Sequence, residues 1–444
     1  MKIKNLFALL LTFAMVLGLF GCSMGGEKET TAPPPYVLNE DSPLQGVPTY
    51  DYGTYVYWQD MGEGAEMLTY QKVWDKDKYL AHLELVKNGG FTLYSENNIN
   101  GNYYASWINE NIQLNTIYMP ELGLVRLVAE PLAELPGKAE ENVYQDAGMA
   151  TLAVQVGVNY DGLTRNGMCY IYRLCDGSFI IVDSGFNQEK VADAIYDTLV
   201  ALAPESGEIV IAAWIFSHAH SDHTGGFYAF TPKYADKVKL EQVIYNFPTT
   251  IVFEKDDTSV GHITKLPENV RKYQGARIVE AHPGQKFFIR DCEIEVLYTW
   301  EMFPSSADTI SFFNESCIIF TLTMEGQRIM QLGDCAPNTT RAMEKIYGES
   351  LKSDFIQVAH HGMVGASETL NKLIGADVVM WPASDYRYEI GKLDEHNKPF
   401  QKAKALYVAG QRVTVIPLPY NEDLVETWVI EHYTPAQEGV QDKL

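Results

Sequence analysis

Residues 209–226 read IVIAAWIFSHAHSDHTGG, an apolar run that ends in a cluster of histidines and an aspartate. The apolar run, 209–216, suits a strand that is buried on both faces between layers of helices. The imidazoles and the carboxylate of residues 218–223 would be costly to bury without partners. A divalent metal would satisfy them, because neutral imidazole and carboxylate are good ligands for zinc, iron or manganese. The stretch therefore predicts a metal site at the end of a buried strand.

The spacing of the side chains within this cluster predicts ligands for two ions. His218 and His220 alternate in an extended loop and can point to one ion, whereas Asp222 and His223 can turn toward a second. The glycine pair 225–226 would let the chain turn tightly into the next element. A plain polar surface loop is the alternative, but it gives no reason for so many metal-binding side chains in one place.

The cluster resembles the His-x-His-x-Asp-His motif of the metallo-β-lactamase superfamily, whose members also carry the glycine pair after it. The resemblance spans residues 145–430 and implies an α/β fold, an αββα four-layer sandwich. It also implies a hydrolase with two divalent metal ions as cofactors, zinc being the expected metal and manganese or iron the alternatives. In such a site a metal-activated water attacks the substrate.

Three further motifs fall in the order that this family has. Asp183 follows a strand-like run and corresponds to a carboxylate beside the metal site, which would orient a ligand; an ordinary turn is the alternative. Asp334 follows a second strand-like run and corresponds to the carboxylate that bridges both ions. His360 and His361 end a third run, 355–359, where the family has a histidine ligand for the second ion.

Adjacent side chains on a strand face opposite ways, so only one of His360 and His361 should bind metal while the other faces substrate or a hydrogen-bond partner. The resemblance thus implies these candidate metal ligands: His218, His220, Asp222, His223, Asp334, and His360 or His361. The candidate catalytic residues are Asp222, which would also orient the attacking water, Asp183 and His361.

Many members of the family carry one more histidine ligand before the bridging aspartate, and here no histidine lies in a matching context. His262 lies in a polar stretch, and His282 lies in what looks like a turn. This absence, together with the block that begins at Asn314, resembles one branch of the family. That branch includes the hydrolase domain of bacterial DNA-uptake channels and the phosphorylcholine esterases of teichoic acid. Asn314 would contact substrate or brace the site, and Tyr386 and Tyr388 would either line the pocket or serve ordinary packing.

The resemblance to this branch favours a phosphoester as the substrate of the two-metal-activated water. Lactonase, thioesterase or β-lactamase chemistry on the same fold is an alternative. A non-catalytic surface-binding lipoprotein is a further alternative, although a scaffold has no use for costly clustered ligands.

The first 22 residues resemble a bacterial lipoprotein signal peptide. Lys2 and Lys4 precede the apolar run 6–20, which is short for a membrane span, and Cys22 would be the lipidated residue. A simple secretory signal is the alternative. Residues 23–48 are polar and Pro-rich, which is typical of a tether. We therefore expect an exported protein, anchored by lipid at the cell surface, that acts on a small molecule or a component of the cell envelope.

Residues 49–135 carry many aromatics, alternate in a strand-like way and include a short helical pattern that starts near Asp77. We predict a small α+β domain here. It contains no cluster of histidines, cysteines or acidic residues with a spacing that indicates chemistry, so we expect a binding or spacer role. A segment rich in Pro, Gly, Ala and Glu, 131–141, is the predicted boundary, and the metallo-β-lactamase-fold hydrolase domain is expected over residues 140–435.

The charge balance argues against a polyanionic partner. The chain has 58 Asp and Glu against 34 Lys and Arg, a net charge of −24, and such a surface repels nucleic acid at long range. Lysines scattered in the sequence could still gather in a folded groove, so nucleic acid is disfavoured rather than excluded. The cysteines beyond Cys22 form no C-x-x-C pair and indicate neither a disulfide framework nor a structural zinc site.

Overall fold

The computed structural model describes residues 38, 40–138, 144, 148–159, 166–205, 207–249, 252–253, 260–302, 309–310 and 313–430. These belong to one compact unit, Val37–Leu444. The predicted signal peptide 1–22, with Cys22 as the predicted lipidation site, and most of the predicted tether lie outside the described residues. Among the residues that are described, no helix has the length and hydrophobicity that a membrane span needs.

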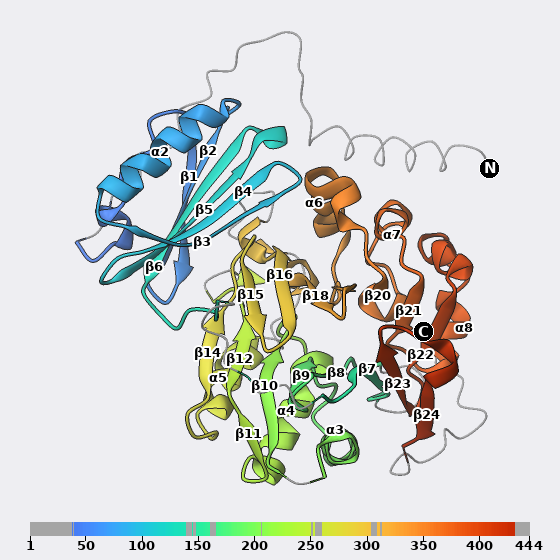
Figure 1. Cartoon of the computed structure of the whole chain (residues 1–444). Helices are drawn as coiled ribbons and strands as arrows, with labels where there is room; N and C mark the ends of the chain where they lie inside the picture. The colour runs from blue at the N-terminus through green and yellow to red at the C-terminus, as the bar shows by residue number, and fades with distance from the viewer. Residues whose placement is uncertain are drawn as a thin grey trace, which may run out of the picture. The chain divides into compact units, whose positions relative to one another are not determined.

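The N-terminal part of the described chain is one antiparallel sheet with a helix on it (Figure 1). The sheet has six strands in the order β1-β2-β6-β5-β4-β3. The elements are η1 (Pro43–Gly46), β1 (Thr54–Gly62), β2 (Ala65–Gln71), α2 (Lys76–Asn88), β3 (Thr92–Ile99), β4 (Asn102–Ile108), β5 (Ile112–Met119), η2 (Pro120–Leu122) and β6 (Leu124–Pro131). The Asp75 side chain caps α2 by accepting a hydrogen bond from the backbone N–H of Asp77. Tyr79 of α2 is buried and its hydroxyl lies 3.1 Å from Thr116 Oγ1 on β5, so this helix packs on the sheet.

The rest of the chain forms two larger sheets. The first has nine strands, in the order β14-β12-β10-β9-β8-β7-β23-β24 with β11 beside β10. Its strands are β7 (Thr151–Val156), β8 (Tyr170–Arg173), β9 (Phe179–Val182), β10 (Ile209–Ile215), β11 (Val238–Leu240), β12 (Gln242–Tyr245), β14 (Arg277–Glu280), β23 (Arg412–Leu418) and β24 (Glu426–Val429). The strands β9, β10, β12 and β14 are parallel neighbours, so their carboxyl ends lie along one edge of the sheet.

The second large sheet has seven strands in the order β15-β16-β18-β19-β20-β21-β22. Its strands are β15 (Lys286–Ile289), β16 (Cys292–Tyr298), β18 (Ile319–Met324), β19 (Gln327–Gln331), β20 (Phe355–Gln357), β21 (Val378–Trp381) and β22 (Ala405–Val408). A short parallel pair joins β13 (Val252–Phe253) to β17 (Thr309–Ile310).

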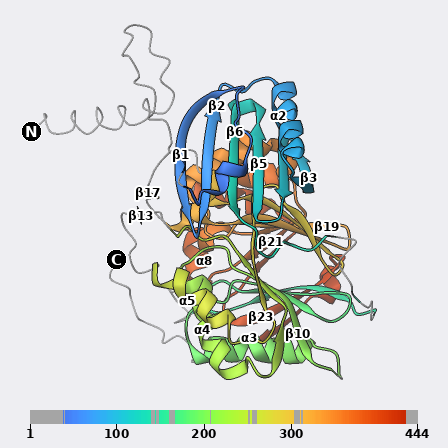
Figure 2. The same ribbon diagram turned by 90° about the vertical axis from the view of Figure 1, so that its left-hand side faces the viewer.

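Helices accompany both large sheets, as Figures 1 and 2 show. The α-helices are α3 (Glu189–Leu202), α4 (Ser221–Tyr234), α5 (Val260–Val270), α6 (Pro337–Tyr347), α7 (Glu368–Ile374) and α8 (Asp385–Gly391). The 3-10 helices are η4 (Trp300–Met302), η5 (Phe313–Ser316), η6 (Gly348–Leu351), η7 (Ala359–Gly362), η8 (Glu395–Lys402) and η9 (Glu422–Leu424).

Three apolar cores separate four layers. Because strand side chains alternate between faces, Ile181 of β9 packs in one core with Phe227 of α4. The neighbouring Ile180 packs in a second core with Phe320 of the other sheet. A third core joins the outer face of that sheet to α6, through Met343. The predicted α/β fold, an αββα sandwich preceded by a small α+β domain, is confirmed.

The N-terminal sheet is joined to the sandwich by buried polar contacts. Tyr104 of β4 shares a 2.6 Å hydrogen bond with Tyr347 of α6, and Asn102 Nδ2 donates to the Ile346 carbonyl oxygen at 2.9 Å. The Tyr104 ring lies directly against Gly284, where a Cβ would come within 1.9 Å of the ring. Glycine is therefore required at this contact, which also has a left-handed φ of +80°.

Candidate metal centre

The histidine cluster lies where β10 ends and α4 begins. The pairing of Val182 on β9 with Ile215 on β10 brings together the residues that follow each strand. The chain then passes through His218 and enters α4, with His220 as the residue that precedes the helix. Ligand sites in α/β proteins form at the carboxyl ends of parallel strands, and this cluster occupies such an end.

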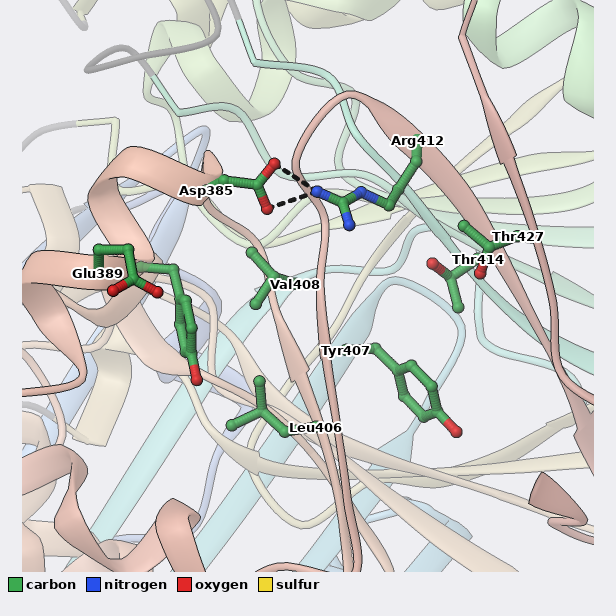
Figure 3. Close-up of a pocket in the computed structure, with 9 residues that line it drawn as sticks. Asp385, Glu389, Leu406, Tyr407, Val408, Arg412, Thr414 and Thr427 are labelled. Atoms are coloured by element: carbon green, nitrogen blue, oxygen red, sulfur yellow. Dashed lines mark hydrogen bonds and ion pairs between the residues drawn. The ribbon is translucent and has the colours of Figure 1, made fainter.

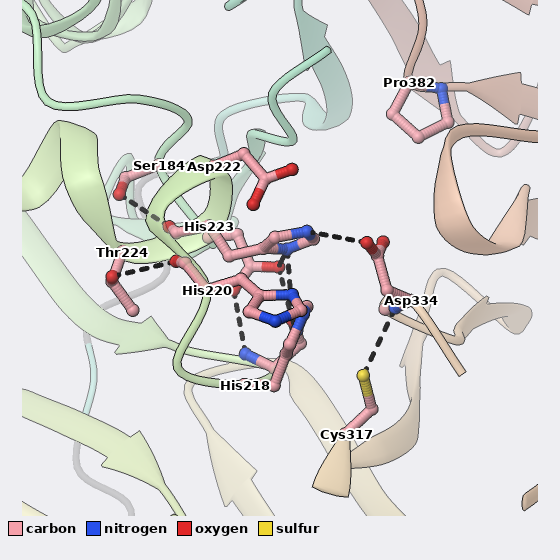
Figure 4. A network of polar contacts seen from close by, with 12 residues as sticks. Ser184, His218, His220, Asp222, His223, Thr224, Cys317, Asp334 and Pro382 are labelled. Atoms are coloured by element: carbon pink, nitrogen blue, oxygen red, sulfur yellow. Dashed lines mark hydrogen bonds and ion pairs between the residues drawn. The ribbon is translucent and has the colours of Figure 1, made fainter. Parts of the chain in front are cut away.

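The structure gathers the predicted side chains into two groups that share one residue. In each group every side chain offers a ligand atom, and these atoms lie within 4.8 Å of one another. One group is His218, His220 and Asp334, and the other is Asp222, His223, Asp334 and His361. Asp334 Oδ2 lies 3.2 Å from His223 Nε2 and 3.6 Å from His361 Nε2. Figure 4 shows the His223 ring directed toward Asp334.

Buried ligand atoms that make no hydrogen bond indicate that these residues fit a metal. His223 Nε2, His361 Nε2 and Asp334 Oδ1 are buried and, within the described residues, make no hydrogen bond. A buried polar atom that lacks a partner costs free energy. A divalent cation at the centre would satisfy all three, and imidazole and carboxylate are the donors that zinc, manganese and iron accept.

The groups around the centre shift the pKa values of its histidines in opposite directions. Burial lowers the pKa of His218 well below its ordinary value, and the neighbouring His223 and His220 lower it further. Its ring is therefore neutral, which is the metal-binding form. Burial opposes protonation of His223 as well, but the carboxylates of Asp334, Asp183 and Asp222 outweigh it and raise the pKa of His223. Despite burial, His223, His361 and His360 hold the pKa of Asp334 well below its usual value.

Asp183 positions the loop that carries the ligands. Its Oδ1 accepts from the Ser217 backbone N–H at 2.8 Å, and its Oδ2 accepts from Ser217 Oγ and from His223 Nδ1, both at 2.7 Å. Its backbone has a left-handed φ of 55°. Because Nδ1 of His223 is engaged by Asp183, Nε2 is the nitrogen presented to the ligand group. Asp183 thus lies beside the centre, where the sequence predicts an orienting carboxylate.

The prediction that His360 and His361 face opposite ways on a strand is wrong. The strand β20 ends at Gln357, and both histidines lie in the turn η7 with left-handed φ values of 49° and 54°. His361 Nδ1 donates to the Pro382 carbonyl oxygen at 2.7 Å, and its Nε2 lies 3.4 Å from Asp222 Oδ2. His361 is therefore the member of the pair that joins a ligand group.

His360 lies at the edge of the same centre. Its Nδ1 donates to the Val364 carbonyl oxygen at 2.6 Å, and its Nε2 lies 3.9 Å from Asp334 Oδ2. Asn314 Nδ2 is 3.3 Å from the same Nε2. His360 retains 25 % side-chain exposure, against 1 % for His361, so it is the histidine that an incoming substrate can reach.

The remaining candidates do not join a ligand group among the described residues. His262 Nδ1 lies 2.8 Å from the Thr224 hydroxyl and so braces α4. His282 is buried in a separate cluster of carboxylates. Tyr388 packs edge-on against a tryptophan ring, with 5.0 Å between the ring centroids, and Tyr386 is exposed.

Supporting residues that sequence reasoning missed hold the Asp334 loop. Gln357 Oε1 accepts from the backbone N–H groups of Leu332 and Gly333, both at 2.8 Å. The Asp334 N–H lies 3.3 Å from Cys317 Sγ. A glutamine within an otherwise apolar strand is the sequence signal that could have identified Gln357.

The structure explains the glycine pair 225–226 by close packing and not by the predicted tight turn. Both glycines lie within α4, which passes close to the loop that follows β9. A Cβ at Gly226 would come within 1.8 Å of the Ser184 carbonyl oxygen, and one at Gly225 within 2.4 Å of the Asn187 nitrogen. The pair therefore permits close packing that holds the ligand loop against the Asp183 loop.

One protein-family model matches the chain. It is described as the metallo-beta-lactamase superfamily and matches residues 163–301. This span contains Asp183 and the cluster at 218–223, and it ends before Asp334. No curated protein matches the sequence.

Several solved structures are similar to parts of the chain. The metallo-beta-lactamase fold protein YhfI from Bacillus subtilis is 14% identical, with 59% of this chain and 97% of that chain covered and a TM-score of 0.37. Human tRNase Z, short form, is 13% identical, with 51% of this chain and 91% of that chain covered and a TM-score of 0.33. Unliganded yeast PDE1 is 13% identical, with 59% of this chain and 98% of that chain covered and a TM-score of 0.35.

Proposed function

Because the chain belongs to the metallo-β-lactamase superfamily, we propose that it is an exported hydrolase that uses two divalent metal ions to cleave a phosphoester. The observation that carries the proposal is Asp334, a buried carboxylate that belongs to two ligand groups at once. The family and the donor set support a metal-dependent hydrolase in general. The number of ions, the phosphoester and the export are the finer parts of the proposal.

Each ligand group would hold one ion, with zinc expected and manganese or iron as alternatives. His218 and His220 would bind the first ion, His223, His361 and Asp222 the second, and Asp334 both. When bound, such ions supply a water of lowered pKa and stabilise the negative charge that develops on the attacked group.

The protein groups around the ions would set orientation. Asp183 and the Pro382 carbonyl each accept from the Nδ1 of one histidine ligand, which aims Nε2 of His223 and of His361 at the centre. Asp222 is the more exposed of the two ligand carboxylates, at 23 % against 2 % for Asp334. We therefore assign to Asp222 the hydrogen bond that orients the attacking water.

His360 is suited to handle the leaving group. Its Nδ1–H is committed to the Val364 carbonyl, so Nε2 is the atom that can give or receive a proton. This atom lies beside Asp334 without belonging to a ligand group. We assign to His360 Nε2 the transfer of a proton, first taken up from solvent, to the departing alkoxide; Asn314 Nδ2 lies 3.3 Å from this atom.

The preference for a phosphoester rests on the make-up of the first ligand group. In the described part of the chain it contains no third histidine, since His262 contacts Thr224 and His282 contacts glutamates. This pattern is similar to the branch with phosphoester substrates. Lactonase, thioesterase and β-lactamase chemistry remain the competing activities on this fold.

Metal analysis and a substrate panel test the proposal. Purified protein should hold about two transition-metal ions per chain and hydrolyse bis-p-nitrophenyl phosphate or p-nitrophenyl phosphorylcholine. A lactone and a chromogenic cephalosporin complete the panel. Less than about one bound metal per chain would favour the non-catalytic binding lipoprotein, and turnover of the cephalosporin alone would contradict the phosphoester.

Export is tested by fractionation. We propose that Cys22 carries the lipid anchor and that the substrate is a small molecule or a component of the cell envelope; nucleic acid is disfavoured by the net charge of −24. The chain should partition into the membrane fraction, and Cys22→Ser should release it. Membrane retention of the Cys22→Ser variant would contradict a lipid anchor on this residue.

A further inference from the structure

A cavity of about 840 Å³ lies away from the metal-ligand groups, where the N-terminal sheet meets the sandwich. One side comes from the β1–β2 turn and from β6, including Glu63 and Val128. The other side comes from the ends of β12 and β14, including Tyr245 and Glu280. Its volume is that of a site for a small molecule, and none of its lining residues belongs to a ligand group.

The walls combine aromatic rings with acidic groups. Tyr245, Phe247 and Trp300 line the cavity together with aliphatic side chains. The charged lining residues are one arginine and five glutamates: Arg277, Glu63, Glu130, Glu134, Glu280 and Glu301. The wall therefore carries far more negative than positive charge.

Part of this negative charge is already compensated. His282, behind the wall, lies 2.9 Å from Glu130 and 2.8 Å from Glu301. Arg277 lies 3.5 Å from Glu134.

Two of the glutamates remain without compensation. Within the described residues, Glu63 and Glu280 form neither an ion pair nor a hydrogen bond through their side chains. Both carboxylates are exposed to solvent, Glu63 on the β1–β2 turn and Glu280 at the end of β14. The cavity therefore has a negative potential that the protein itself does not neutralise.

We propose that this cavity binds a small organic cation, an ammonium group carried on an apolar or aromatic body. The ammonium would lie between Glu63 and Glu280, and the body would pack on Tyr245, Phe247 and Trp300. Carboxylates attract the charge, and aromatic faces attract both the charge and the apolar body. A bare metal ion fits less well, because the described carboxylates here do not converge on a common point. An anion would meet repulsion.

A second, smaller pocket differs in that its charged side chains form ion pairs. It measures about 280 Å³ and is lined by residues of α8, β22, β23 and β24. Its charges are compensated: Figure 3 shows Arg412 directed at Asp385, and Glu389 pairs with Lys392 at 2.5 Å. Because these charged side chains are already paired, they give less reason to expect a bound ion in the smaller pocket.

Calorimetry of the full chain tests the proposal with hexylammonium and benzylammonium, using hexanol and benzyl alcohol as neutral probes of the same shape. One equivalent of at least one ammonium should bind, at least about tenfold more tightly than its alcohol.

Variants locate the site. The double substitution Glu63→Gln and Glu280→Gln should weaken ammonium binding at least about tenfold, with circular dichroism and thermal melting checking the fold. Glu426→Gln, on an exposed position of β24, removes the same charge elsewhere and should leave binding unchanged. Equal affinity for ammonium and alcohol, undiminished binding by the double variant, or failure of both ammonium probes to bind would each overturn the proposal.

Discussion

At the scale of single residues, Asp183 offers the sharpest test of how the ligands are held. Asp183→Asn keeps the size and tolerates the left-handed backbone, but an amide cannot accept both from Ser217 and from His223 Nδ1 as the carboxylate does. We expect metal affinity to fall about 10- to 100-fold, measured by competition with a chelator. Asp385→Asn, at an exposed carboxylate, is the control. Unchanged metal affinity in Asp183→Asn would show that Asp183 has no orienting role.

The adjacent histidines give a paired prediction. His361→Ala removes a buried member of a ligand group, so metal content should fall toward about one ion per chain. His360→Ala should keep the metal content and lower kcat by about 10²- to 10⁴-fold, as expected for loss of a general acid. Metal analysis and steady-state kinetics check both. Loss of metal in His360→Ala with full occupancy in His361→Ala would reverse the assignment.

The ligands within the motif could be predicted because their spacing in sequence leads directly to their positions in space. His218, His220, Asp222 and His223 follow one buried strand and occupy one loop and the first turn of α4. The orientation of His360 and His361 could not be predicted. It depends on left-handed φ values at two consecutive histidines, which non-glycine residues adopt only when the surrounding structure imposes them.

At the scale of elements, the closest packing near the centre is that of α4 on the loop after β9. Gly226→Ala would place a Cβ within 1.8 Å of the Ser184 carbonyl oxygen, so the helix or the loop must move. We expect destabilisation of about 1–3 kcal/mol or more, measured by denaturant unfolding, together with weaker metal binding. Gly261→Ala in α5 is the matched control, because a Cβ there meets nothing within 4 Å. Equal stability of the two variants would contradict this account of the glycine pair.

Sequence patterns predict whether most segments around the centre are helices or strands. They do not predict which segments lie next to one another in space. The run 209–216 is apolar throughout and forms the central strand β10, as expected for a strand covered on both faces. The predicted strand 355–359 is shorter, because β20 ends at Gln357, whose side chain hydrogen-bonds the Asp334 loop. That partner is 24 or 25 residues away in sequence, and local patterns carry no information about it.

At the scale of the whole molecule, the sequence predicts two folded parts but not how they interact. Among the described residues, neither ligand group includes a residue of the N-terminal sheet, and its expected binding or spacer role stays a prediction. Its buried Glu130 nevertheless meets His282 of the sandwich, and this histidine looks like a turn residue in the sequence. A contact between distant segments becomes visible only when both are placed in space.

This contact leads to a prediction on stability. His282 is buried between Glu130 and Glu301, and the two carboxylates raise its pKa well above the ordinary value despite the cost of burial. His282→Asn leaves two buried carboxylates without their cation, so we expect a loss of about 3–5 kcal/mol near pH 6. His396→Asn, whose imidazole bonds only a carbonyl oxygen among the described residues, is the control.

The pH dependence of this loss has a definite sign. A group whose pKa is higher in the folded than in the unfolded chain contributes its full stability below its unfolded pKa of about 6.5. The contribution declines by about 1.4 kcal/mol per pH unit as pH rises toward the folded pKa. The difference in free energy of unfolding between the native chain and His282→Asn should therefore be largest near pH 6 and shrink in alkaline solution. A difference that grows with pH would contradict a charged His282 in the folded protein.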